Sequence, residues 1–252
     1  MKSSSAPRPD QAEGTSQTAR ATLALREMLV QGRFHPGERM REIPLAKQLG
    51  VSRIPLRLAL ERMAHEGFLE IRPTRGFIAQ QFSIADIYDA IELRGSIEGT
   101  AARFAAERLQ DARELEPLRD LNEQMVILVR RRKLTLENVT EYIDLNSKFH
   151  AEVLNLSRSR LLRRAMEQVC SHPFASPSAF LRRHYIAPES HELFLISVEH
   201  HRGIVEAIAG RESARAESIT REHARVARRN LESALSNSEI GESVPGLKLI
   251  KL

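Results

Sequence analysis

The fold of this chain is decided by residues 45–79, which read LAKQLGVSRIPLRLALERMAHEGFLEIRPTRGFIA. The pattern predicts a helix that begins after Ser52 and runs to about Glu66. Ser52 is a favourable N-cap, and apolar residues recur at helical spacing from Leu56 to Met63. Residues 68–71 and 77–79 then alternate on either side of a Pro-Thr-Arg-Gly turn, which predicts a small β-hairpin.

Two further helical patterns precede this stretch. Residues 18–30 mix apolar and polar positions, and the turn residues Gly32 and His35-Pro36-Gly37 follow them, so a helix is predicted that stops there. Residues 43–49 predict a second, short helix that ends before Gly50. Three helices followed by a small hairpin form a winged helix-turn-helix, which we expect to occupy residues 18–80.

The positive charge of the chain is concentrated in the same segment. Residues 18–80 contain 11 Lys and Arg against 6 Asp and Glu, a balance of +5, whereas residues 81–252 contain 25 of each sign. Residues 1–17 are neutral overall and rich in Ser, Pro and Gln, so we expect a disordered leader there. A basic segment joined to a neutral one is typical of a nucleic-acid-binding domain attached to a domain of another kind.

Several short motifs in the basic segment resemble those of a known family. In the same order and without gaps, they resemble the DNA-binding signature of the GntR family of bacterial transcription regulators: Pro36-Gly37-Glu38-Arg39, Leu45-Ala46, Leu49-Gly50-Val51-Ser52-Arg53, Pro55-Leu56-Arg57, Ala59-Leu60, Glu66-Gly67 and Arg75-Gly76. The resemblance implies that this segment binds double-stranded DNA. A protein-interaction module is the alternative for a winged helix, and the local positive charge favours DNA.

The candidate DNA contacts lie mainly on the predicted recognition helix. Arg53 and Arg57 are four positions apart, so both project from one face of that helix, toward guanine edges or phosphates in the major groove. By resemblance, Arg75 and Gly76 form the tip of the wing. The full set of candidates is Arg39, Arg41, Ser52, Arg53, Ile54, Arg57, Arg75 and Gly76. For Arg39 and Arg41, a simple solvated position on the surface is the alternative.

Two positions on the recognition helix depart from the family pattern. Ile54 stands where Thr is usual, Leu58 stands where Glu is usual, and the two are again four positions apart. Exposed aliphatic side chains at these positions would meet thymine methyl groups in the major groove. The alternative is that they pack against the first helix or a neighbouring domain.

From residue 83 onward, the sequence predicts long helices and no strands. Helices are expected near residues 83–109, 115–131, 135–156, 159–171, 189–209 and 212–236. Residues 81–238 should therefore form an all-α antiparallel bundle, followed by a C-terminal tail at residues 239–252. Glu92-Leu93-Arg94 with Glu98, Phe149-His150 and the pattern of residues 201–208 resemble the FCD ligand-sensing domain of the FadR subfamily.

Polar residues on the apolar stripes of this bundle are candidate metal ligands. Asn146 and His150 lie four apart within one stripe, and His223 is in line with the apolar positions of another helix. Buried imidazoles that converge can be satisfied by a divalent metal ion. By resemblance, the ligands of the FCD metal site map to Asn146, His150, His201 and His223, and the ion would be zinc, nickel or manganese.

Three questions stay open for this metal site. Asn146 stands where the family has Asp, and a neutral amide is the weaker ligand. His200 lies nearer than His201 to the middle of the local apolar stripe, although the family pattern selects His201. Buried histidines that only form hydrogen bonds are the alternative to a metal site.

The family resemblance also implies the ligand and the assembly. We expect a small organic acid as the effector, with Arg94 providing a charge-assisted fork for its carboxylate. Arg182 and Arg183 are weaker candidates for this role. A homodimer is expected, because a twofold-symmetric protein reads a palindromic operator. The expected function is therefore that of a ligand-responsive transcription regulator, most simply a repressor.

Other classes of protein are less compatible with the sequence. It contains no HExxH motif, no Gly-rich phosphate loop and no nucleophile elbow, so we do not expect an enzyme. A metal-dependent enzyme that uses the histidines, and an architectural DNA-binding dimer without a ligand, are the alternatives. No apolar run approaches the roughly 18 residues that a membrane helix needs, and no secretory signal is present. With Cys170 as its single cysteine, the chain is expected to be cytoplasmic.

Overall fold

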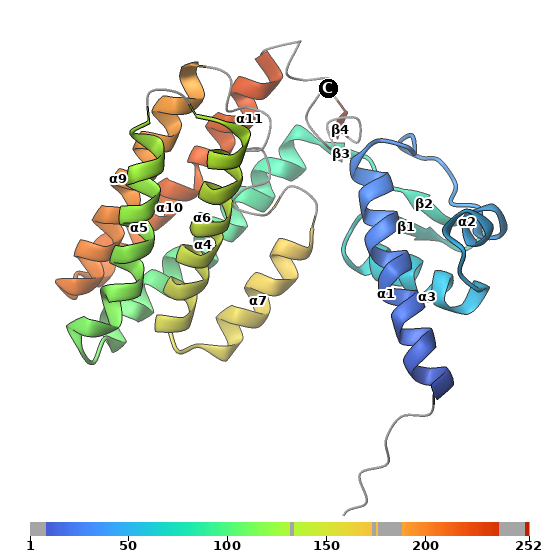
Figure 1. The fold of residues 1–252 in the computed structure, drawn as a ribbon, viewed down its shortest axis with the longest axis horizontal. Helices are drawn as coiled ribbons and strands as arrows, with labels where there is room; N and C mark the ends of the chain where they lie inside the picture. The colour runs from blue at the N-terminus through green and yellow to red at the C-terminus, as the bar shows by residue number, and fades with distance from the viewer. Residues whose placement is uncertain (1–8, 132–133, 173–174, 176–187, 237–249, 252) are drawn as a thin grey trace, which may run out of the picture. The chain divides into compact units, whose positions relative to one another are not determined.

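The computed structural model describes residues 9–131, 134–172, 175, 188–236 and 250–251. The chain divides into two compact units, one comprising Met1–Ser83 with Pro245–Leu252 and the other comprising Ile84–Val244. Figure 1 shows that the first unit combines helices with short strands, whereas the described part of the second is helical.

The first unit is a winged helix-turn-helix, as predicted. Its described elements are α1 (Pro9–Val30), α2 (Glu42–Leu49), α3 (Arg53–His65), β1 (Leu69–Arg72), β2 (Gly76–Ala79), β3 (Phe82–Ser83) and β4 (Ile250–Lys251). Strands β1 and β2 pair antiparallel, with Leu69 opposite Ala79. The pairing of β3 with β4 was not expected: it is parallel, and it brings two residues of the predicted C-terminal tail into this unit.

The core of this unit explains how α3 is held. Leu56, Leu60 and Met63 of α3 pack with Leu25 and Leu29 of α1, and all five side chains are fully buried. Such a stripe, repeated every three or four residues, buries one face of a helix and leaves the other in solvent. The core therefore fixes which residues α3 exposes.

The turn between α2 and α3 depends on two residues. Gly50 ends α2 with a φ of 61°, a left-handed conformation that glycine adopts without steric cost. Ser52 occupies the N-cap position of α3, but its side chain forms no capping hydrogen bond, in contrast to the sequence prediction. Its backbone N–H instead donates to Oε1 of Gln17, at 3.4 Å.

Helix α1 begins earlier than the sequence predicts. It starts at Pro9, so residues 9–17, which were expected to belong to a disordered leader, continue the helix. Once packing has nucleated a helix, each further residue adds a hydrogen bond without a new nucleation cost. Proline is also well tolerated as the first residue of a helix.

The second unit is an all-α bundle, as predicted. Its described elements are α4 (Ile84–Arg108), the short 3-10 helix η1 (Ala112–Leu115), α5 (Glu116–Val129), α6 (Leu136–Leu156), α7 (Arg160–Ser171), α9 (Pro188–Ala209), α10 (Ser213–Ala224) and α11 (Val226–Ser236). The helix predicted over residues 212–236 is two helices, because hydrogen bonds of 3-10 type at Arg225 interrupt it. None of the helices in the described ranges is long and apolar enough to cross a membrane.

Two glycines let α10 lie unusually close to α4. A methyl group added at Gly95 would lie 2.8 Å from Cβ of Ala224, and one added at Gly99 would lie 2.7 Å from Cγ of Arg221. Real Cβ atoms do not approach so closely, and the Ala224 Cβ cannot rotate away. The glycines therefore set the distance between these helices, which also sets the position of His223 on α10.

We expect Gly95→Ala to be less stable than Gly203→Ala by about 1–3 kcal/mol, the usual cost of overpacking a core. Both glycines are helical, so both substitutions gain the same helix propensity of about 1 kcal/mol. A methyl group at Gly203 would meet only the side chain of Ile219, with Cδ1 at 3.4 Å and Cγ2 at 3.8 Å, which are ordinary van der Waals contacts. Urea unfolding followed by circular dichroism measures the difference, and equal stability of the two variants would contradict the close approach.

Candidate DNA interface and candidate metal centre

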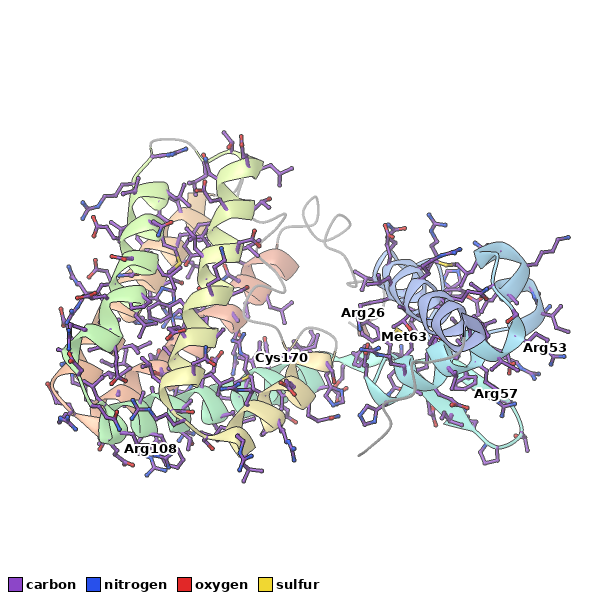
Figure 2. The ribbon with its side chains drawn as sticks, turned by 60° about the horizontal axis from the view of Figure 1, so that its bottom comes forward. Arg26, Arg53, Arg57, Met63, Arg108 and Cys170 are labelled. Atoms are coloured by element: carbon purple, nitrogen blue, oxygen red, sulfur yellow. The ribbon has the colours of Figure 1, made fainter. Side chains whose placement is uncertain are left out.

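Helix α3 presents a mixed basic and aliphatic face to solvent. Arg53 and Arg57 are exposed and project outward from α3 in Figure 2. Beside them, Ile54 is 76% exposed and Leu58 is 51% exposed, so neither is buried against the first helix, which was one of the alternatives for these positions. Arg57 pairs with Glu61 of the same helix at 3.5 Å, but surface ion pairs of this kind are weak and leave the guanidinium free to reorient.

The hairpin and the segment before α2 add exposed arginines to this unit. Arg75 lies in the turn between β1 and β2, and Gly76 follows it with a φ of 71°. Arg39 is exposed, and its backbone pairs with Ile78 of β2. Arg41 is also exposed and directly precedes α2. Within the described ranges, no ion pair neutralises Arg39, Arg41, Arg53 or Arg75.

Glu66 neutralises two of the arginines in this unit. It is 5% exposed and forms ion pairs with Arg26 of α1 and with Arg62, whose Nε lies 3.1 Å from Oε1 of Glu66. The pair with Arg26 attaches the end of α3 to α1, and the pair with Arg62 lies within the last turn of α3. Two of the arginines in the predicted basic segment therefore stabilise the unit, which the charge count did not reveal.

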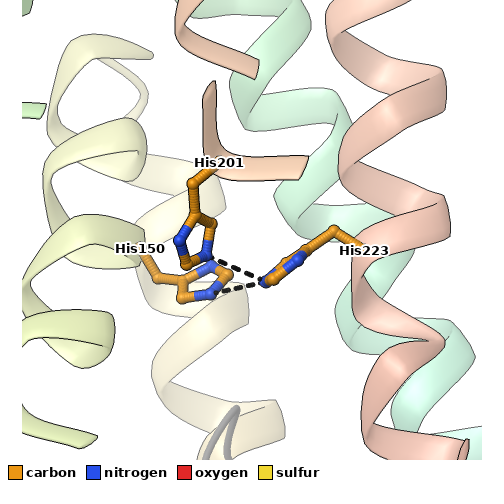
Figure 3. Close-up of side chains that lie close together, drawn as sticks. All are labelled: His150, His201 and His223. Carbon is orange, nitrogen blue, oxygen red and sulfur yellow. Dashed lines mark hydrogen bonds between the residues drawn. The ribbon is translucent and has the colours of Figure 1, made fainter. Parts of the chain in front are cut away.

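Three histidines meet inside the second unit, each from a different helix. His150 belongs to α6, His201 to α9 and His223 to α10. Nε2 of His223 lies 3.2 Å from Nε2 of His201 and 3.2 Å from Nε2 of His150, as Figure 3 shows. His201 is fully buried, His223 is 7% exposed and the His150 side chain is 10% exposed. One small ion could contact all three nitrogens, because one ligand atom of each histidine lies within 4.8 Å of the others.

The protonation of this histidine cluster suits a cation. Burial lowers the pKa of both His201 and His223 well below the usual 6.5, and the neighbouring imidazoles lower it further, so both are neutral at neutral pH. A single N–H on His223 can satisfy only one of its two close neighbours. Protons alone therefore leave a lone pair unmatched in a buried position, which a divalent ion would satisfy.

Glu98 of α4 supports the cluster from outside. Its Oε1 lies 3.1 Å from Nδ1 of His150, so His150 donates Nδ1–H to it and directs the Nε2 lone pair toward the other histidines. Burial alone would raise the pKa of Glu98, but His150 and Arg94 lower it to about 2. Within the described part of the chain, the Nδ1 atoms of His201 and His223 have no such partner. From the sequence, Glu98 was recognisable only as part of the motif that resembles the FCD domain.

Arg94 is a buried cation with free donors. It is 2% exposed, its Nη2 donates to the carbonyl oxygen of Ala224 at 3.3 Å, and its Nε lies 3.8 Å from Oε2 of Glu98. Its Nε and Nη1 form no hydrogen bond within the described ranges. A buried guanidinium in this state is a ready partner for a carboxylate. Arg182 and Arg183, the weaker candidates, lie outside the described residues.

The structure also places the two residues about which the sequence left questions. Asn146 is 3% exposed and lines a small polar pocket of about 20 Å³ together with Arg94 and His223. His200 is only half-buried and its ring centre lies 5.9 Å from that of His223, outside the group of converging nitrogens. His201, not His200, is thus the member of the cluster.

The fold and the buried histidines define a protein with a winged helix-turn-helix and a helical unit that has a candidate ligand site. Residues 17–78 match the profile of bacterial regulatory proteins of the gntR family, and residues 89–226 match the profile of the FCD domain. The chain belongs to the GntR family and carries an FCD domain.

Two curated relatives are regulators. The chain is 35% identical over 142 residues to the Nta operon transcriptional regulator of Aminobacter aminovorans, covering 56% of this chain and 64% of that protein. It is 26% identical over 137 residues to the transcriptional repressor RspR of Escherichia coli, covering 54% of this chain and 58% of that protein. The chain thus spans less than two thirds of the length of either relative.

Two solved structures share the fold. McbR/YncC of E. coli superposes with a TM-score of 0.56 at 21% identity, covering 86% of this chain and 95% of that chain. Lar, which controls expression of the Listeria monocytogenes agr system, superposes with a TM-score of 0.58 at 20% identity, covering 84% of this chain and 96% of that chain. At these identities the likeness concerns the fold alone.

Proposed function

We propose that the protein is a transcription repressor that binds a palindromic DNA operator as a homodimer. The observation that carries this proposal is the exposed face of α3, where Arg53 and Arg57 stand beside two uncovered aliphatic side chains. Guanidinium groups bind guanine edges and phosphates, and the wing with Arg75 offers a further contact. The relatives described above are transcription regulators, which supports the same function.

We further propose that the second unit senses a small organic acid through a divalent metal ion. His150, His201 and His223 would hold the ion, and Asn146 would be a weak additional ligand. Three imidazoles fit zinc, nickel or manganese, and such an ion supplies a Lewis acid that binds a carboxylate. Arg94, with its two free donors, would bind the same carboxylate.

The position of Glu98 favours sensing over catalysis. Its lowered pKa keeps the carboxylate ionised at neutral pH, and its Oε1 is already engaged by His150, so it is a poor general base. Its contact with Nδ1 of His150 at 3.1 Å instead orients an imidazole, which is the usual role of a carboxylate behind a metal ligand.

Selection of DNA by the full-length protein tests the proposed function. We expect a pool of random duplexes to yield one enriched inverted repeat, bound with an affinity that falls steeply as salt increases. Ile54 and Leu58 are proposed to contact thymine methyl groups in that repeat. Replacing a contacted thymine with uracil should lower the affinity of the protein for the duplex about fourfold, since one buried methyl group contributes about 0.8 kcal/mol.

The matched control is the same pair of duplexes with the Ile54→Ala variant, which should no longer distinguish uracil from thymine at the position that Ile54 contacts. A pool without enrichment would overturn the DNA-binding function. Enrichment with no sensitivity to uracil at any position would overturn only the thymine contacts.

A further inference from the structure

An apolar cavity adjoins the histidine cluster. Its volume is about 190 Å³, and its wall contains Phe149, Leu154, Met166, Cys170 and Ile204, which come from α6, α7 and α9. Glu98 and His150 lie at its edge, so the cavity reaches the candidate metal centre. The polar pocket that Arg94 lines is far smaller, about 20 Å³, which is room for one water-sized group. The bulk of any ligand at this centre therefore has to occupy the apolar cavity.

The wall of this cavity is almost wholly apolar and has few hydrogen-bond donors left. The hydroxyl group of Ser147 donates to the carbonyl oxygen of Ile143 at 2.8 Å, and that of Thr220 donates to the carbonyl oxygen of Ala216 at 2.7 Å. Both hydroxyl protons are therefore used within their own helices and cannot be donated to a ligand. A ligand rich in hydroxyl or carboxylate groups would lose its water against this apolar wall and gain few partners, which is unfavourable for the polar groups buried.

We propose that the effector is a monocarboxylic acid with an apolar body, an aromatic ring or a branched hydrocarbon of about six to eight carbon atoms, rather than a sugar acid or a polycarboxylic acid. The inference rests on the proposed function, since the carboxylate would bind at the histidine centre while the body fills the cavity. An apolar cavity of about 150 Å³ is enough for a benzene ring, so the volume fits this size. Met166 and Cys170, whose sulfur atoms lie 3.4 Å apart, form a soft wall that can adapt to different bodies.

Calorimetric titration of the zinc-loaded full-length protein tests the class of ligand. Three acids serve as probes: phenylacetate, acetate and glucuronate. Acetate lacks the apolar body, and glucuronate carries hydroxyl groups in its place. We expect phenylacetate to bind at least tenfold more tightly than acetate and glucuronate, because it alone buries apolar surface. As the single cysteine of the chain, Cys170 provides a second readout: phenylacetate should slow its alkylation by iodoacetamide, and acetate should not.

Two variants of one residue locate the binding. Cys170→Phe fills the cavity and should reduce the affinity for phenylacetate to that for acetate, while zinc content and acetate binding stay unchanged. Cys170→Ala leaves the cavity open and should retain the preference for phenylacetate. Two outcomes would overturn this inference and leave the proposed function standing. In one, glucuronate binds in a zinc-dependent manner and phenylacetate does not bind. In the other, both variants bind phenylacetate equally well. Absence of binding by all three acids would overturn the inference and the organic-acid effector together.

Discussion

His223→Ala is expected to abolish metal binding and, with it, the response of DNA binding to the effector. Its Nε2 lies 3.2 Å from both other histidines, so its removal leaves two imidazoles, which are too few to hold a divalent ion in a buried site. Elemental analysis of protein purified without a metal-affinity tag should find about one ion per wild-type chain and almost none in the variant. Basal affinity for the operator should remain, because the winged helix-turn-helix is not altered.

The neighbouring histidine provides the matched control. His200→Ala removes an imidazole from the same helix as His201, but its ring lies outside the converging nitrogens, so metal content should be unchanged. Metal-free wild-type protein that takes up no supplied metal and still responds to its effector would contradict the metal centre.

The pH dependence of metal occupancy follows from the same geometry. Protons compete with the metal for imidazole nitrogen, so occupancy falls as pH falls through the pKa of the ligands. Burial lowers the pKa of His201 and His223 well below 6.5, so at these two ligands proton competition should begin only below the ordinary histidine range. Asn146→Asp should strengthen binding, because it adds an anionic ligand in a pocket that already contains the Arg94 cation.

Arg53→Ala and Arg57→Ala are each expected to weaken operator binding by about 1–3 kcal/mol, which is roughly fivefold to 150-fold. Both side chains are exposed on α3, and the fully buried side chains of this helix lie on the opposite face. The substitutions should therefore leave stability nearly unchanged. Fluorescence anisotropy with the selected duplex measures the loss of affinity, and thermal unfolding measures stability.

Two controls separate a specific contact from a general effect of charge. Arg119→Ala removes one exposed positive charge from α5 of the other unit and should change operator affinity little. Arg57→Lys keeps the charge but loses the planar fork, so it should retain affinity only if Arg57 contacts phosphate rather than guanine. Full affinity in both alanine variants would mean that α3 is not the recognition helix.

Sequence reasoning was most successful where the physics is local. Helical spacing, the Gly50 turn and the alternation around Pro73-Thr74-Arg75-Gly76 predicted the winged helix-turn-helix, because these signals depend on neighbours along the chain. The outward position of Arg53 and Arg57 followed from the same spacing once the buried stripe was known. The predicted start of α1 at residue 18 was wrong, because composition could not show that a packed helix would extend back to Pro9.

The candidate metal centre was only partly accessible from the sequence. Periodicity indicated that His150 and His223 face inward, but it favoured His200 over His201 in the middle of the stripe. Adjacent residues on a helix point about 100° apart, and the width of an apolar stripe does not resolve that difference. The packing of α9 against α10 decides it, by bringing His201 within 3.2 Å of His223.

The sequence by itself therefore determined the class of each unit, the basic face of α3 and two of the converging histidines, His150 and His223. Only the tertiary structure decided that Glu98 supports His150, that Arg94 is buried with free donors, and that an apolar cavity of about 190 Å³ adjoins the cluster. These features join residues far apart in the chain. Their geometry depends on the rotation and spacing of packed helices, which Gly95 and Gly99 set between α4 and α10 and which no local pattern encodes.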